Sequence, residues 1–129
     1  MSKEYLKGTP QQEARSYSSA IIATGRTIYL AGVGGAEDES GKSLAGDFAG
    51  QTRATFNNLR KALEKAGAKL EDIVTMQVYV TDMKYGLLFV QMRKEFFPAG
   101  RYPCSALIGI NQLARHEMMI EIQAIAVVD

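Results

Sequence analysis

The chain has little of the chemistry that marks a disulfide framework or a metal site. Its 129 residues include one cysteine, Cys104, and one histidine, His116. A lone cysteine excludes an internal disulfide framework and favours a reducing compartment, so we expect a cytoplasmic protein. One histidine and one cysteine do not make a familiar zinc site, so no metal is expected.

Long apolar segments and an excess of charge of one sign are also missing. No window approaches the length of a membrane span and the first residues contain no apolar segment, so we expect neither a membrane helix nor a signal peptide. Lys and Arg total 15 against 14 Asp and Glu, a formal net charge of +1. That balance argues against nucleic acid as a partner. No linker and no internal repeat divide the chain, so residues 1–129 are expected to form a single domain.

The apolar residues that are present follow strand and helix periods. Runs at 18–24 and 27–33 predict two strands, and Gly25 with Arg26 between them favours a hairpin. A stripe at helical spacing predicts a helix over 47–66, with Asp47 as N-cap and Gly67 beyond its C-terminus. A second helix is predicted over 82–97 and further strands over 72–80, 102–110 and 117–128. The second helix's apolar stripe is Tyr85, Leu88, Phe89, Met92 and Phe96.

The predicted order is strand-strand-helix-strand-helix-strand-strand. Two such helices cover one face of a single sheet, which gives an α+β fold. The last strand has apolar residues on both of its faces, because Ile125 and Val127 alternate with Ile122, Ala124 and Ala126. We therefore infer that its second face is also buried, and subunit association is the economical way to bury it.

Several short motifs occur along the chain in a recognisable order. They are S-Y-S-S-A at 16–20, I-Y-L-A-G at 28–32, Q-T-R-A-T-F-N-N-L at 51–59, G-A-K-L-E-D-I-V at 67–74, V-Y-V-T-D-M at 78–83 and E-I-Q-A-I-A-V at 121–127. Together they resemble the RidA/YjgF family of reactive-intermediate deaminases over nearly the whole chain. The resemblance implies a chorismate-mutase-like α+β fold, a homotrimer, and pockets for a small-molecule ligand in the clefts between subunits.

The resemblance also implies a reaction. Family members of known activity hydrolyse short-lived enamines and imines derived from amino acids and release ammonia. An arginine fork holds the substrate's carboxylate, which it matches in shape and charge. A carboxylate and backbone carbonyls then place a water against the imine carbon. No metal or organic cofactor is implied.

The chain departs from this pattern at most of the site positions. In the segment 103–107, the family's arginine falls on Ser105 and its cysteine on Leu107. A family serine falls on Ala31, and a family asparagine falls on Val90. These changes predict a pocket that has lost its anion clamp and most of its polarity. We therefore expect poor turnover of small 2-iminoacids and a ligand that is more neutral, larger or more apolar.

Two polar positions match the family, Tyr17 and Glu121. The resemblance implies that Tyr17 lines the pocket and that Glu121 is the catalytic carboxylate. Alternatively, Tyr17 is a packed aromatic and Glu121 lies on a wet face beside Gln123. Ser105 is not expected to act as a nucleophile, because that requires a base and the one histidine, His116, is a poor candidate to supply it.

Two arginines are candidates to replace the missing one. Arg101 lies four residues before Ser105, at the entrance to the strand, and its alternative role is a loop residue in solvent. Arg115, in the polar break before the last strand, is the second candidate.

The function favoured by these residues is a divergent deaminase-like hydrolase acting on an enamine, an imine or a related unstable metabolite. The alternative is a non-catalytic small-molecule-binding or regulatory trimer. A ribonuclease or translation-inhibitor role is disfavoured by the near-zero net charge.

Overall fold

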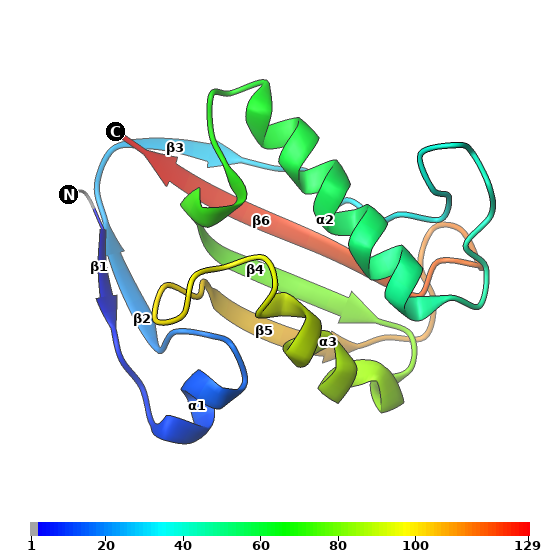
Figure 1. The fold of residues 1–129 in the computed structure, drawn as a ribbon, viewed down its shortest axis with the longest axis horizontal. Coiled ribbons are helices and arrows are strands. Elements are labelled where there is room, and N and C mark those ends of the chain that lie inside the picture. Colours follow the sequence, from blue (N-terminus) through cyan, green and yellow to red (C-terminus); the bar gives the residue numbers. More distant parts are fainter. Residues whose placement is uncertain (1–2) are drawn as a thin grey trace.

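The computed structural model describes residues 3–129 and shows a four-stranded sheet with two main helices on one face (Figure 1). The strands are β1 (Lys3–Leu6), β2 (Ala20–Ala23), β3 (Arg26–Tyr29), β4 (Ile73–Val80), β5 (Cys104–Gly109) and β6 (Ile120–Val128). The helices are α1 (Pro10–Ala14), α2 (Phe48–Glu64) and α3 (Gly86–Arg93), with short 3-10 turns at Leu70–Asp72 and Met83–Tyr85. The predicted mixed α+β fold is confirmed. The chain also forms β1 and α1, which precede the predicted elements in the sequence.

The main sheet has the order β3-β6-β4-β5, which leaves β5 at one edge. β4 pairs with β5 in parallel and with β6 antiparallel. The predicted hairpin between the first two apolar runs is wrong, because β2 pairs with β1 while β3 pairs with β6. The chain passes from one ladder to the other at Gly25, whose φ is +136°. A Cβ there would lie 2.2 Å from the carbonyl oxygen of Val128, so the close approach requires glycine.

α2 agrees closely with its prediction. Asp47 is the N-cap, and its carboxylate accepts a hydrogen bond from the backbone N–H of Gly50 at 2.9 Å. The buried side of the helix includes Phe56, Leu59 and Leu63, each fully inaccessible to solvent. This apolar stripe packs on the sheet and fixes the position of the helix.

α3 is shorter than predicted, because the segment begins as a 3-10 turn and its regular part ends at Arg93. Leu88, which was predicted to face the core, is 42% exposed. Val90 and Arg93 are buried instead, at 2% and 1% exposure. The buried side of α3 therefore ends in a charged residue.

The faces of β6 differ in their surroundings. Ile120, Ile122 and Ala124 lie under the helices and are almost completely buried. Glu121 and Ile125 lie on the helix-free face, where they are partly exposed, and Tyr29 of β3 beside Ile125 is 77% exposed. Within residues 3–129, no helix has both the length and the hydropathy needed to cross a membrane.

Candidate functional site

Arg93, in the last turn of α3, holds a buried guanidinium group at the edge of the sheet. Its side chain is tied to three oxygen atoms from distant parts of the chain. Nε donates to the hydroxyl of Ser16 at 3.0 Å, and Nη1 donates to the hydroxyl of Ser105 at 2.6 Å. Nη2 donates to the backbone carbonyl of Arg15 at 3.1 Å. The group is thus fixed in position by α3, β5 and the segment that follows α1.

All three of these acceptors are neutral. Among residues 3–129, no carboxylate forms an ion pair with Arg93, and the ring of Phe89, 5.0 Å from its Cζ, adds only a cation–π contact. Burial, and then the charge of Arg15, lower the pKa of Arg93 to about 10. The group therefore remains protonated at neutral pH, as a buried positive charge without a negative partner.

The segment around Ser16 fixes the position of the Arg93 side chain. Ser16 is fully buried and has φ +62°, a left-handed conformation that is uncommon for a residue with a side chain. Its hydroxyl lies 2.7 Å from the carbonyl oxygen of Val90, near the end of α3 where helix carbonyls lack backbone partners. Ser18 is anchored next to it, because its backbone N–H donates to the carbonyl of Pro103 at 3.0 Å. Tyr17 is held between these two anchors.

A pocket of about 230 Å³ forms at this junction. It is lined by Arg15, Tyr17, Val90, Arg93, Ser105 and Leu107. Ser105 and Leu107 face the helices because they lie beside Met76 and Val78, which are buried residues of β4. The structure thus brings together four residues that were predicted for the site.

The sequence predicted a pocket that has lost the arginine at position 105, and the structure places the guanidinium group of Arg93 in the lining of this pocket. Ser105 does occupy the position where the resemblance places an arginine, but its hydroxyl accepts a hydrogen bond from Arg93. The pocket therefore has a positive charge supplied by a different element, α3 instead of β5.

Glu121 and Ala31 do not join this pocket within one copy of the chain. Glu121 lies beside Tyr79 on the helix-free face of the sheet, whereas Ser105 faces the helices. The carboxylate of Glu121 packs against Gly32, where an added Cβ would lie 2.5 Å from Oε2. Ala31, next to Gly32 in the chain, is exposed. The predicted site residues are thus divided between opposite faces of the sheet.

The arginines proposed as replacements lie elsewhere. The Cζ of Arg101 is 5.3 Å from the ring centroid of Tyr5. Arg115 forms ion pairs with Glu117 at 2.6 Å and with Glu37 at 3.4 Å. The side chain of His116 is 95% exposed and lies 3.5 Å from Glu117, so it makes no pair with Ser105. None of the three lines the pocket.

Sequence reasoning missed Arg93, although a signal for it was available. In the predicted second helix, Gly86, Phe89, Val90 and Arg93 occupy positions i, i+3, i+4 and i+7. An arginine that continues an apolar stripe at this spacing is placed on the buried face. Its appearance there indicates either a buried partner or a ligand.

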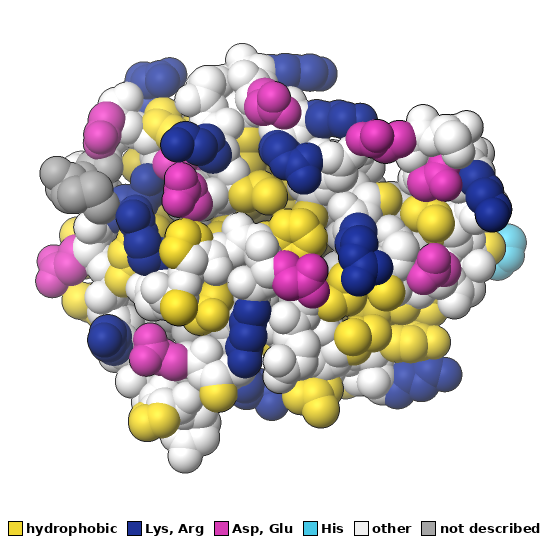
Figure 2. Space-filling view, viewed as in Figure 1, with side chains coloured by type: hydrophobic (Ala, Val, Ile, Leu, Met, Phe, Trp, Pro, Cys, Tyr) yellow, Lys and Arg dark blue, Asp and Glu magenta, His cyan; other side chains and the backbone are white. Residues whose placement is uncertain are grey.

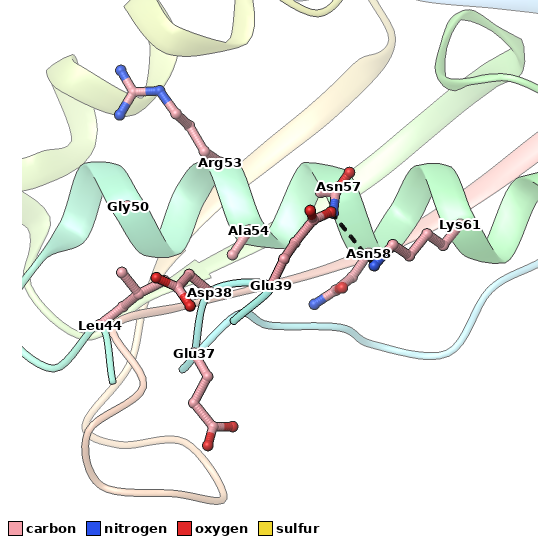
Figure 3. A pocket seen from close by; sticks show the side chains of 10 residues that line it. All are labelled: Glu37, Asp38, Glu39, Leu44, Gly50, Arg53, Ala54, Asn57, Asn58 and Lys61. Atoms are coloured by element: carbon pink, nitrogen blue, oxygen red, sulfur yellow. Dashed lines mark hydrogen bonds and ion pairs between the residues drawn. The ribbon is translucent and has the colours of Figure 1, made fainter. Parts of the chain in front are cut away.

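A larger pocket, of about 490 Å³, lies between α2 and the loop that precedes it (Figure 3). Glu39 in that loop accepts a hydrogen bond from Asn57 at 2.7 Å and forms an ion pair with Lys61 at 3.7 Å. Both charges of this pair are exposed, and they neutralise each other. The lining of this pocket therefore contains no unpaired buried charge, whereas the lining of the smaller pocket contains Arg93.

The residues described contain no cluster of three His, Cys, Asp or Glu side chains that could hold a metal ion. The fold and the pocket define a small α+β protein with two helices on one face of a sheet and a buried cation at the sheet's edge.

Comparison with known proteins identifies the family. A family model described as endoribonuclease L-PSP matches residues 9–128. A RutC family protein of Pyrococcus abyssi is 32% identical over 110 residues, which cover 85% of this chain and 84% of that protein. A 2-iminobutanoate/2-iminopropanoate deaminase of Dermatophagoides farinae is 26% identical over 100% of both chains. A solved Rid family protein from Yersinia pestis, described as of unknown function, has a TM-score of 0.87 at 25% identity and covers 99% of this chain and 100% of its own. The chain belongs to the RidA/YjgF family.

Proposed function

We propose that this protein is a deaminase-like hydrolase that acts on a small imine or enamine in the clefts of a homotrimer. The observation that carries the proposal is the division of the site residues between two faces of one sheet. The Arg93 pocket opens on the helix side of β5, and Glu121 lies on the helix-free side of β6. Two such half-sites form one site only where the pocket of one copy meets the Glu121 face of the next.

The helix-free face supports this arrangement. Tyr29 is 77% exposed there, and Ile125 and Tyr79 are only partly covered. A hollow of about 180 Å³ is lined by Tyr29, Gln77, Gln123 and Ile125, among others. An aromatic and aliphatic surface of this kind is typical of an interface between copies.

In the proposed reaction, Glu121 accepts a proton from a water molecule, whose oxygen attacks the imine carbon. The C=N double bond becomes a single bond, and the nitrogen takes up a proton. The resulting carbinolamine collapses to a carbonyl compound, and ammonia leaves with the second proton. An imine and water thus give a ketone or an aldehyde and ammonia, with no change of oxidation state. The contribution of the protein is positioning and proton transfer.

The test is ammonia release from imines and enamines generated in situ, measured for the wild type and Glu121→Gln. We expect the substitution to lower the rate by a factor of about 10² to 10⁴, the usual contribution of a general base. Equal rates for the two proteins at every substrate would contradict the proposal. Absence of turnover combined with ligand-dependent thermal stabilisation would favour the alternative, a non-catalytic binding trimer.

Mixed assemblies test whether the site is shared between subunits. Arg93→Met and Glu121→Gln subunits, each of which should release ammonia much more slowly than the wild type, are unfolded together and refolded at equal concentration. Random assembly of trimers should restore about a quarter of the wild-type activity, since each mixed ring contains one cleft with an intact residue from each side. A mixture as inactive as its components would contradict a shared site.

The ribonuclease role is less well supported, although the family description includes that activity. Figure 2 shows basic and acidic side chains interspersed over the helix-covered face, without a continuous basic stripe. The single histidine is at the surface and away from the pocket.

A further inference from the structure

We propose that the side-chain amides of Gln51 and Asn58, the α2 amides, are positioning groups that hold the carboxylate of Glu121 in place for proton transfer. Both amides lie on the helix side of the sheet, whereas Glu121 lies on the helix-free side. They act through the two backbone segments that meet beside Glu121. Their effect on the reaction rests on the proposed function, whereas their effect on the backbone can be measured without any reaction.

The amide of Gln51 is fully buried and is bonded to the backbone of two other segments. Its Nε2 donates to the carbonyl of Leu44 at 3.0 Å and to the carbonyl of Glu117 at 2.9 Å. Its Oε1 accepts from the N–H of Met119 at 2.8 Å. These partners define the orientation of the amide, because a flipped amide would set its oxygen against both carbonyls. Since Met119 immediately precedes β6, Gln51 fixes the start of this strand two residues before Glu121.

Asn58 lies two helical turns after Gln51, so both side chains project from the same side of α2. Its Nδ2 donates to the carbonyl of Gly34 at 2.8 Å. The next residue, Gly35, packs so closely on the helix that an added Cβ would lie 2.4 Å from the Cβ of Ala54. The segment that follows β3 is therefore fixed against the same helix that fixes the start of β6.

The two anchored segments lie next to a bulge between β3 and β6. The regular ladder ends where Tyr29 pairs with Ile125. The next ladder pair is Val33 with Ile122, so the first strand has advanced by four residues and β6 by three. The extra residue lies within 30–32 and forms a bulge. A bulge disrupts the ladder locally, so the ladder alone does not define the path of the two strands there.

The carboxylate of Glu121 lies at this bulge. An added Cβ on Gly32 would be 2.5 Å from its Oε2, so a small movement of either strand changes the surroundings of the carboxylate. Val33 and Ile122 join the strands beyond the bulge by hydrogen bonds of 2.9 and 2.8 Å. Just past this pair, the α2 amides bind both strands to the helix. The helix thus sets the separation of the strands where the bulged ladder does not.

This role also explains a part of the sequence that the Arg93 pocket leaves unused. The α2 amides are the first and eighth residues of the motif Q-T-R-A-T-F-N-N-L at 51–59, and neither lines that pocket. A buried amide needs hydrogen-bond partners wherever it lies. Packing alone does not require that these partners flank a bulge and a carboxylate.

The first experiment compares Asn58→Ala, Asn58→Asp and Asn57→Ala with the wild type by ammonia release. Asn58→Ala leaves the carbonyl of Gly34 without its donor, and Asn58→Asp, ionised at neutral pH, repels that carbonyl. We expect kcat to fall about tenfold for the alanine variant and further for the aspartate variant, with little change in KM. Asn57→Ala, which removes an amide bonded to Glu39 in the exposed loop, is the matched control. Asn58 variants as active as this control would overturn the proposal.

A second comparison separates positioning from a general structural effect. Asn58→Ala is combined with Glu121→Gln, and the double variant should be no slower than Glu121→Gln alone if Asn58 acts through the carboxylate. Two rate factors that multiply would overturn the proposal. Gln51→Glu loses both amide donors and should behave as Asn58→Asp does. A folded Gln51→Glu protein with the wild-type rate would overturn the role of Gln51, and if this variant fails to fold, the Asn58 series still decides.

Nuclear magnetic resonance distinguishes failure of this inference from failure of the proposed function. Asn58→Ala should speed hydrogen exchange at the N–H of Ile122, which donates to the carbonyl of Val33, and should shift the carboxyl ¹³C resonance of Glu121. Both changes without turnover of any imine would leave the positioning role in place and remove the hydrolase. Turnover that is lost in Glu121→Gln and undiminished in Asn58→Ala would do the opposite. An unchanged Glu121 resonance in Asn58→Ala would overturn the positioning role.

Discussion

The hydroxyl of Ser105 on the edge strand β5 accepts a hydrogen bond of 2.6 Å from Nη1 of Arg93 in the last turn of α3. This contact places a guanidinium group at a position where the strand itself has none. It also links the stability of the helix end to the integrity of the pocket.

Removing the hydroxyl should therefore destabilise the protein. Ser105→Ala leaves Nη1 of Arg93 without this partner in a part-buried setting, and we expect a loss of about 1–2 kcal/mol in the free energy of unfolding. Urea unfolding at a fixed protein concentration measures it. Ser19→Ala, at an exposed position, is the control and should change little. A value for Ser105→Ala within error of this control would contradict the structural role.

Ser16 combines a left-handed backbone with a buried hydroxyl, and two substitutions separate the two effects. Ser16→Ala loses the contacts with Val90 and Arg93 and keeps the backbone strain, so we expect a loss of about 2–3 kcal/mol. Ser16→Gly loses the same contacts but removes the strain at φ +62°, and it should be the milder change. Thermal unfolding of the pair measures the difference. The opposite order of stabilities would show that the hydroxyl and the strain have been assigned wrongly.

Gly32 controls the position of the Glu121 carboxylate. A Cβ at this position would lie 2.5 Å from Oε2 and 3.1 Å from Cδ of Glu121, so Gly32→Ala should displace the carboxylate without affecting the core. We expect ammonia release to fall by about tenfold to a hundredfold, because a displacement of about 1 Å has that effect on a positioned group. Gly109→Ala, whose Cβ would meet only the flexible end of Met83 at 3.3 Å, is the matched control. Equal activities of the two variants would argue against a catalytic Glu121.

The helix-free face predicts where association can be broken. Ile125→Glu places a carboxylate on the proposed interface, and we expect the proposed trimer to dissociate because an unpaired charge is costly to bury. Sedimentation velocity measures the assembly state. Ala45→Glu, in the exposed loop before α2, should leave it unchanged. An Ile125→Glu protein that sediments as the wild type does would place the interface elsewhere.

Much of the scaffold was predictable because local patterns determine it. The spacing from Phe48 to Leu63 and the capping residue Asp47 identify α2 without reference to the rest of the molecule. The pairing of β2 was not predictable in the same way. The run at 18–24 and the run at 27–33 are both apolar, and nothing local shows that their partners are β1 and β6.

The same distinction between local pattern and distant packing applies to the candidate site. The sequence alone determined which residues match or depart from the family pattern, including Tyr17, Glu121 and the serine at 105, because identity at a position is a local property. Only the tertiary structure decided that Arg93 supplies the charge and that Glu121 lies on the opposite face. Arg93 is buried because Ser16, 77 positions away in the chain, folds over the end of α3. From sequence alone, a charged residue is expected at the surface. Only the packing between distant segments shows when such a residue is buried.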